Sequence, residues 1–94
     1  MIARNWRGGG GELDLVVLRD SQLNFVEVKA RNEGTLSFGD RVPIQKQERL
    51  IGAAETFLIN CPVPFDEMFF TVALVDVSKR PWTVELLEDA FSRA

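Results

Sequence analysis

Two short segments place acidic side chains and a lysine within otherwise apolar sequence. The first is the run Gly-Glu-Leu-Asp that ends at Asp14, and the second is the run Phe-Val-Glu-Val-Lys that ends at Lys29. Ionised groups in apolar strands are costly unless something binds them. If the two segments form neighbouring strands, Asp14 and Glu27 can face the same pocket, where their mutual repulsion favours a bound cation.

The chemistry that these residue types support is metal-dependent hydrolysis of a phosphodiester bond. Carboxylates are hard oxygen ligands, and they suit Mg²⁺ or Mn²⁺ ions that keep several of their waters. Such an ion at Asp14 and Glu27 would activate a bound water and offset charge on the phosphate. Lys29 lies two residues after Glu27, on the same side of the strand, where it could orient the water or stabilise the phosphate. The spacing leaves an alternative open, in which these groups form salt bridges near solvent.

Neighbouring strands have to position these groups. Residues 12–18 alternate in a strand pattern that puts Asp14 and Val16 on one face and Leu13 on the other. This run and residues 25–29 are apolar on both faces, which predicts strands covered on both sides. Turn residues between the two runs predict an antiparallel hairpin.

A strand is also expected over residues 2–6, ahead of four consecutive glycines at positions 8–11. The glycines predict a flexible hairpin turn, because glycine relaxes the limits on backbone conformation. A phosphate-binding loop is the alternative, although the run lacks the Gly-Lys-Ser/Thr ending of a P-loop and leads into a strand.

A helix is predicted from Pro43, as an early helical residue, to about Asn60. Lys46 and Arg49 lie near its N-terminus, an end whose free N–H groups favour anions. Gln47 could orient substrate or water there, or bond to the nearby backbone. The stripe that faces the sheet is expected to comprise Gln47, Leu50, Ile51, Ala54, Phe57 and Leu58.

After the helix, the pattern predicts a hydrophobic strand over residues 70–77 and an edge strand over 82–85. A brief helix ending near Phe91 is expected to follow. The predicted fold class is therefore α/β, a mixed β-sheet with a main helix packed on it. We expect one apolar face of this sheet to remain uncovered, which favours a homodimer.

Length and composition limit the possible classes of protein. Ninety-four residues, 46% of them hydrophobic, suit one domain spanning 1–94. No apolar stretch is long enough to cross a membrane and the start lacks the pattern of a secretory signal, so we expect a cytoplasmic protein without a membrane partner. One cysteine and no histidine exclude an internal disulfide and the usual zinc site.

The net charge of −3 argues against a protein that coats nucleic acid by electrostatics alone. Residues 1–50 nevertheless hold eight Lys and Arg against seven Asp and Glu, whereas residues 51–94 hold three against seven. Basic residues thus accompany the acidic segments, and an ordinary solvated surface is the alternative for each of them. The candidates for contact with phosphates are Arg4, Arg7, Arg31, Arg41, Lys46 and Arg49.

Five short runs, taken in order, resemble the YraN-type family of predicted endonucleases, which are small bacterial proteins related to archaeal Holliday-junction resolvases. The runs are Ile-Ala-Arg-Asn-Trp-Arg from Ile2, Gly-Glu-Leu-Asp, Phe-Val-Glu-Val-Lys-Ala-Arg, Phe38-Gly39, and Lys46-Gln47. Members of that family carry a helix before the Arg-Asn strand, and this chain begins after it. The later family motif Arg-Phe-Asp can be aligned with Pro64-Phe65-Asp66 or with Phe69-Phe70-Thr71. The second alignment, which lacks the Arg and Asp, is favoured because residues 70–77 form a continuous strand pattern.

The resemblance implies the restriction-endonuclease-like fold and a PD-(D/E)xK site. It assigns the Asp of that motif to Asp14 and its Glu-x-Lys to Glu27 and Lys29, with Glu12 as a further metal ligand and Gln47 opening the following helix. Resolvases act as dimers, so a homodimer is implied as well. We therefore expect a Mg²⁺- or Mn²⁺-dependent endonuclease that hydrolyses DNA, with branched DNA as a candidate substrate. The alternative is a catalytically silent nucleic-acid-binding or dimeric assembly domain that retains the fold.

Overall fold

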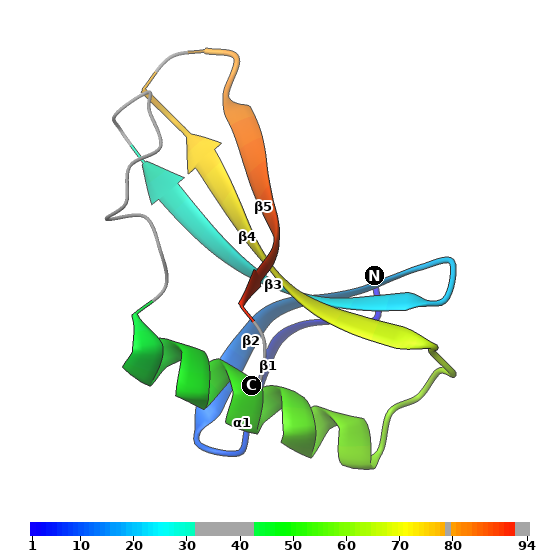
Figure 1. Cartoon of the computed structure of the whole chain (residues 1–94). Coiled ribbons are helices and arrows are strands. Elements are labelled where there is room, and N and C mark those ends of the chain that lie inside the picture. Colours follow the sequence, from blue (N-terminus) through cyan, green and yellow to red (C-terminus); the bar gives the residue numbers. More distant parts are fainter. Residues whose placement is uncertain (32–42, 79, 92–94) are drawn as a thin grey trace.

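The chain forms a five-stranded mixed sheet with a helix packed against one end of it (Figure 1). This computed structural model describes residues 1–31, 43–78 and 80–91. The sequence motif Phe38-Gly39 and the candidate Arg41 lie outside the described residues. The elements in chain order are β1 (Ala3–Gly8), β2 (Gly11–Arg19), β3 (Gln22–Arg31), α1 (Ile44–Ile59), β4 (Glu67–Asp76) and β5 (Thr83–Phe91).

The strands follow one another across the sheet in the order β1-β2-β3-β4-β5. Neighbouring strands are antiparallel except for β3 and β4, which are parallel. A parallel pair needs a long crossover connection, and α1 lies in that connection. The predicted α/β class with a mixed sheet and one main helix is confirmed.

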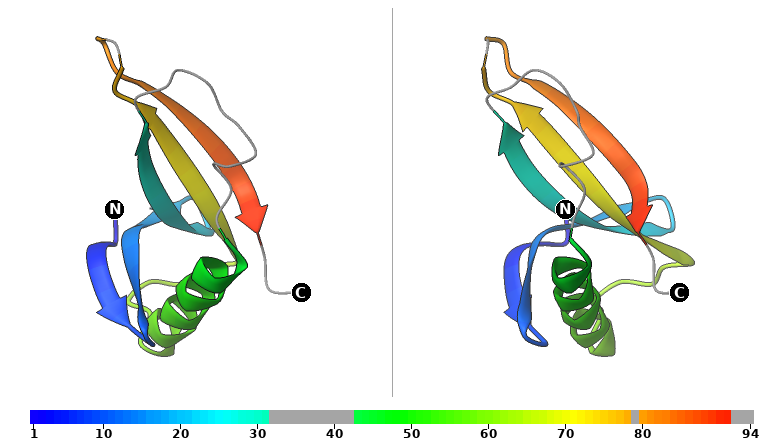
Figure 2. Two further views of the ribbon diagram at one scale, coloured as in Figure 1. Left: turned by 90° about the vertical axis from the view of Figure 1, so that its left-hand side faces the viewer. Right: turned by 60° about the vertical axis from the view of Figure 1, so that its left-hand side comes forward.

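The core lies between α1 and the facing side of the sheet, where α1 contacts β1 and β2 (Figure 2). Phe57 is its centre, because its ring meets Trp6 and Phe25 edge to face, at centroid distances of 5.4 and 6.0 Å. The predicted stripe of α1 is confirmed at its buried members Leu50, Ala54 and Phe57, and Ala53 adds to it. Pro43 is the N-cap of α1 and lies just outside the helix.

The glycine run forms the turn between β1 and β2, as one of its two sequence interpretations predicts. Gly9 and Gly10 have φ values of 58° and 81°, which glycine adopts without strain. The turn also lies directly against α1, since a Cβ atom added at Gly11 would be 2.5 Å from the carbonyl oxygen of Arg49. The absence of side chains therefore lets the backbone of the turn approach the backbone of the helix.

β2 departs from the regular alternation that its sequence predicts. Leu13 and Val16 are both buried in the core, although side chains three positions apart on a regular strand point to opposite faces. Asn5 in β1 has a left-handed backbone, with φ 51°, and lies between Arg4, which pairs with Leu15, and Trp6, which pairs with Leu13. The irregularity opposite Asn5 breaks the alternation, so the prediction that Leu13 and Val16 lie on opposite faces is wrong.

The last described segment is a strand, where the sequence predicted a short helix ending near Phe91. β5 continues from Thr83 to Phe91 and pairs antiparallel with β4, for example Val84 with Val75 and Leu86 with Ala73. Helix formers in this stretch suggested the helix, but the unpaired edge of β4 offers backbone hydrogen bonds that outweigh local propensity. In the described part of the chain, no helix is long and apolar enough to cross a membrane.

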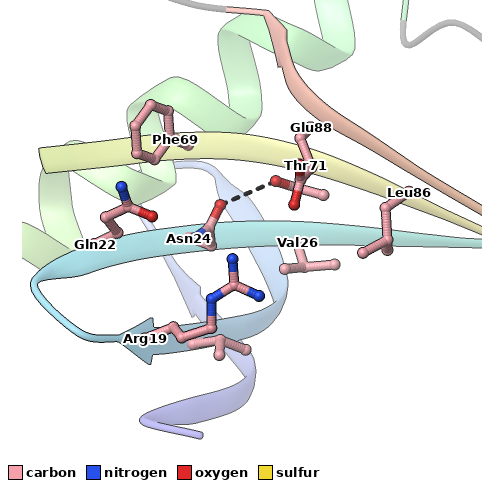
Figure 3. A pocket seen from close by; sticks show the side chains of 9 residues that line it. Arg19, Gln22, Asn24, Val26, Phe69, Thr71, Leu86 and Glu88 are labelled. Atoms are coloured by element: carbon pink, nitrogen blue, oxygen red, sulfur yellow. Dashed lines mark hydrogen bonds between the residues drawn. The ribbon is translucent and has the colours of Figure 1, made fainter.

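Both faces of the strands were predicted to be covered. Among the described residues, α1 covers one face of the sheet, and no element covers the other. On the face away from α1, Val84 and Leu86 of β5 are 58% and 56% exposed. This face is hollowed by a depression of about 470 Å³ (Figure 3). Its lining residues are Val17, Arg19, Gln22, Asn24, Val26, Phe69, Thr71, Leu86 and Glu88.

Candidate active site

The candidate site begins where β2 and β3 separate. Their residue pairs run from Arg19 with Gln22 to Leu15 with Val26. Asp14 directly precedes Leu15 in β2 and lies just beyond this paired stretch. Its carboxylate accepts a hydrogen bond from the backbone N–H of Val28, with Oδ2 and N 2.9 Å apart. An ionised acceptor strengthens such a bond, so it fixes the carboxylate at the mouth of the gap between the strands.

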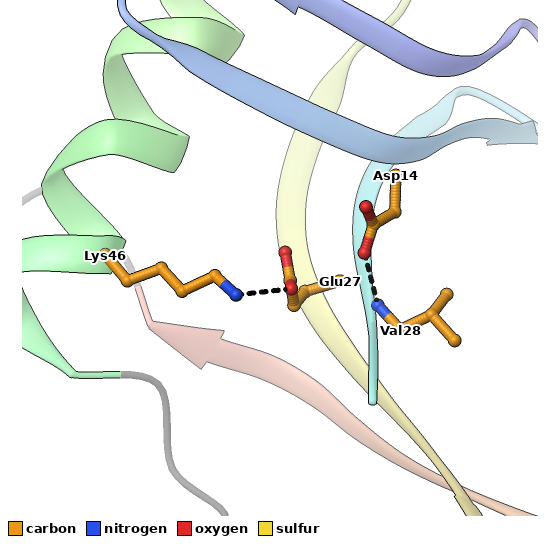
Figure 4. Close-up of polar contacts among 4 residues, drawn as sticks. All are labelled: Asp14, Glu27, Val28 and Lys46. Atoms are coloured by element: carbon orange, nitrogen blue, oxygen red, sulfur yellow. Dashed lines mark hydrogen bonds and ion pairs between the residues drawn. The ribbon is translucent and has the colours of Figure 1, made fainter. Parts of the chain in front are cut away.

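Glu27 is the buried acid of the site, with 8% of its surface exposed. Its Oε1 lies 2.8 Å from the Nζ of Lys46, which reaches over from α1 (Figure 4). Taking a carboxylate out of water is costly, and a close cation with good geometry offsets that cost. The Lys46 side chain is 44% exposed, so water screens the pair on one side.

A cavity of about 370 Å³ joins these groups. The described residues bring three carboxylates and three basic groups to it, so the formal charges of these residues balance. Arg7 and Glu12 form a looser pair at its rim, with Nε and Oε2 3.8 Å apart. In the part of the chain that the structure describes, its lining is Arg7, Gly10, Gly11, Glu12, Asp14, Glu27, Lys46, Arg49 and Leu50.

Not every predicted site residue lines this cavity. Within the part of the chain that the structure describes, Lys29 and Gln47 are absent from its lining. Lys29 lies further along β3, where its backbone pairs with Leu74. The backbone N–H of Gln47 donates to the carbonyl oxygen of Pro43 at 2.9 Å, as expected for a first helical turn. Arg4 is exposed on β1, also away from the cavity lining.

Arg31 is the last residue of β3, and the position of its side chain lies outside what the structure describes. Of the predicted phosphate-binding residues whose side chains the structure describes, Arg7, Lys46 and Arg49 line the cavity. The contact that sequence reasoning missed is the pairing of Lys46 with Glu27. The helical period carried a signal for it, because Lys46 precedes the buried Leu50 by four residues and so lies on the same side of α1.

The carboxylates of the cavity are possible ligands for a divalent cation. Mg²⁺ is commonly bound through one or two carboxylates and keeps several waters, and Asp14 and Glu27 provide two on a shared cavity. Among the described residues, no group of three or more His, Cys, Asp and Glu side chains gathers closely enough to hold a metal ion. Asp14 and Glu27 are therefore the residues that would hold such an ion, with water as its remaining ligands.

The larger depression on the opposite face has a different character. Thr71 donates a hydrogen bond to Oδ1 of Asn24 at 3.0 Å across its floor (Figure 3). Among the residues that the structure describes, its charged lining consists of Arg19 and Glu88, and neither Asp14 nor Glu27 lines it. Size alone would favour this depression, but the residues with hydrolytic chemistry gather in the smaller cavity.

Comparison with known proteins gives one consistent family. A model described as the uncharacterised protein family UPF0102 matches residues 1–78. A UPF0102 protein of Cereibacter sphaeroides is 36% identical over 93 residues, covering 98% of this chain and 76% of that protein. One from Chloroherpeton thalassium is 38% identical over 96 residues, covering 97% and 73%. One from a Synechococcus species is 47% identical over 68 residues, covering 66% and 49%. The chain therefore belongs to the UPF0102 family, which agrees with the resemblance found in its sequence.

Proposed function

We propose that this chain is a metal-dependent endonuclease domain that hydrolyses phosphodiester bonds in DNA. The observation that carries the proposal is that Asp14 and Glu27, from two separating strands, line one cavity together with basic groups. Carboxylates for a metal and cations for a phosphate are the two requirements of this reaction. The family name states no activity, so the proposal rests on the chemistry of the cavity.

The charge balance of the cavity supports a role for Mg²⁺ or Mn²⁺. Among the described lining residues, three carboxylates offset three basic groups, so these residues give a phosphodiester no excess positive charge to bind. A divalent ion bound there would supply that charge and would acidify a bound water. Asp14 is already held in place by the N–H of Val28, which reduces the reorganisation needed for binding.

In the hydrolysis, a water oxygen bonds to phosphorus while the bond from phosphorus to the leaving sugar oxygen breaks. The attacking water loses a proton, and the leaving oxygen gains one. Glu27 is the group best placed to direct the water, because it is buried at the base of the cavity and is fixed by β3. Arg7 and Arg49 line the same cavity and would contact the flanking phosphates.

The proposal includes a homodimer built on the face away from α1. Five strands about 4.8 Å apart, each about nine residues long with a rise of about 3.3 Å, make a face of roughly 700 Å². A stable dimer buries about 800 Å² on each partner, so this face is of the right size. A two-fold pair would present two cavities to one DNA, which suits a branched substrate with two-fold symmetry. A DNA substrate also implies a cytoplasmic location.

One observation favours a second candidate, a catalytically silent nucleic-acid-binding domain. The ammonium of Lys46 already lies beside Glu27, where a metal ion would otherwise neutralise the carboxylate. A protein that used this pair only as a structural contact would bind DNA without cutting it.

Cleavage of labelled DNAs tests the proposal. The panel comprises a duplex, a flap, a single strand and a four-way junction, each with Mg²⁺, Mn²⁺ or a chelator. We expect metal-dependent cutting by the unmodified chain, and its loss in Glu27→Gln, which keeps the shape of the side chain but removes its charge. Cutting that survives both the chelator and Glu27→Gln would refute the proposal. Binding without any cutting would support the silent domain instead.

A further inference from the structure

We infer that Lys46, on α1, is the phosphate-facing lysine of the candidate site, in the place that the strand motif gives to Lys29. The inference rests on the proposed function and identifies the lysine that would contact a phosphate of the DNA. It follows from the position of the Lys46 ammonium beside Glu27, which the spacing along β3 does not reveal.

Lys46 meets the geometric requirement directly. Its Nζ is 2.8 Å from Glu27 and its side chain lines the cavity that also contains Asp14. Lys29 shares the face of Glu27 but lies two residues along β3, a displacement of about 6.6 Å at the usual rise of a strand. In the lining formed by the described residues, Lys46 is present and Lys29 is not.

The position of Lys46 is set by rigid elements. Four residues further along α1, Leu50 is buried in the core and also lines the cavity. Another turn of the helix further, Ala53 and Ala54 are fully buried against the sheet. The close packing of α1 against the sheet fixes the backbone of Lys46. Its side chain is flexible and 44% exposed, so the ammonium can turn from Glu27 to a phosphate.

The competing explanation is that Lys46 only offsets the burial of Glu27. Both explanations predict the ion pair that the structure shows, and both predict some loss of stability when it is removed. They differ in the response of DNA binding to salt. A lysine that contacts a phosphate contributes about one unit to the slope of log K against log salt concentration, whereas one that pairs only with Glu27 contributes nothing.

The test compares Lys46→Met with Lys29→Met, two variants that remove the same charge and keep a similar stem. Circular dichroism first establishes a temperature at which both variants are folded. Binding to a duplex and to a four-way junction is then measured from about 50 to 200 mM salt, with Ca²⁺ in place of Mg²⁺, and single-turnover cleavage is measured with Mg²⁺.

We expect Lys46→Met to lower the magnitude of the salt slope by about one and to slow cleavage by about 10² to 10³-fold, the usual effect of losing one electrostatic stabiliser of the transition state. Lys46→Arg should restore the slope and recover most of the rate, because it restores the cation. Lys29→Met should leave the slope unchanged.

Three outcomes separate this inference from the proposed function. If Lys29→Met lowers the salt slope by about one and slows cleavage while Lys46→Met changes neither quantity, the inference is wrong and the nuclease proposal stands. If Lys46→Met is less stable but binds and cuts like the unmodified chain, Lys46 is a structural partner of Glu27 only. A chain that neither binds nor cuts any DNA refutes the proposed function, and the inference with it.

Discussion

Replacing Gly11 by alanine tests whether close contact between the β1–β2 turn and α1 holds the site together. The new Cβ would lie 2.5 Å from the carbonyl oxygen of Arg49 and 3.4 Å from the Cβ of Ala53. The first contact is far inside van der Waals range and involves backbone of the helix, so no side chain can turn away to relieve it. The turn and α1 must move apart.

The size of the effect follows from two opposing terms. Overpacking of this kind costs about 1–3 kcal/mol, and the lower entropy of an unfolded chain with alanine returns about 0.4–1 kcal/mol. The midpoints of these terms leave a net loss of about 1.3 kcal/mol, which should lower the melting temperature of a domain of this length by roughly 5–10 °C. Thermal unfolding followed by circular dichroism measures it.

Gly10 provides the matched control. A Cβ added there would meet nothing within 4 Å, so only its φ of 81° opposes a side chain. Asparagine tolerates that conformation better than other residues, and Gly10→Asn should therefore cost at most about 1 kcal/mol. If Gly11→Ala melts with the unmodified chain while Gly10→Asn melts lower, backbone conformation and not helix contact governs this turn, and the reasoning above fails.

Three further predictions concern the acid at the strand gap, the core and the exposed face. Asp14→Asn should keep the melting temperature within a few degrees, because its amide oxygen can still accept from the N–H of Val28, but it should abolish metal-dependent cleavage; retained cleavage would remove Asp14 from the site. Phe57→Ala should destabilise the chain by about 3–5 kcal/mol in denaturant unfolding, since it removes the ring between Trp6 and Phe25; a loss below about 1 kcal/mol would contradict the packing described. Leu86→Glu should convert a dimer to a monomer in light scattering without lowering the stability of the monomer, because Leu86 is exposed in one copy; an unchanged dimer would place the interface elsewhere.

The sequence predicted the features that depend on strong local patterns. The hairpin of β2 and β3 follows from two apolar runs separated by turn residues, and that hairpin alone brings Asp14 and Glu27 to one cavity. The extent of α1 follows from the period of its buried residues and from Pro43 at its start. Such patterns are repeated over several residues, so single exceptions do not hide them.

Other features depend on contacts between distant segments, and local sequence patterns do not determine them. The strand β5 contains good helix formers, and only the open edge of β4 decides its conformation. The left-handed backbone of Asn5 breaks the alternation of β2, and no local sequence pattern predicts it. The partner of Glu27 is the difference that matters most for the site. Strand spacing indicates Lys29, which is on β3 with Glu27, whereas the fold brings Lys46 from α1, a helix that begins 17 residues after Glu27.

The glycine run illustrates how such a distant contact can serve the site. A Cβ at Gly11 would overlap the carbonyl of Arg49, and Arg49 lines the cavity together with Lys46. The turn that lacks side chains therefore sets the height of α1 above the sheet, and α1 in turn sets the distance from Lys46 to Glu27. A displacement of about 1 Å in such an arrangement can cost about 10²-fold in rate. Gly11→Ala protein that still folds should therefore cut DNA far more slowly than its stability explains, whereas Gly10→Asn protein should cut at a nearly normal rate. Equal rates for the two variants at a temperature where both are folded would show that the glycines serve the turn alone.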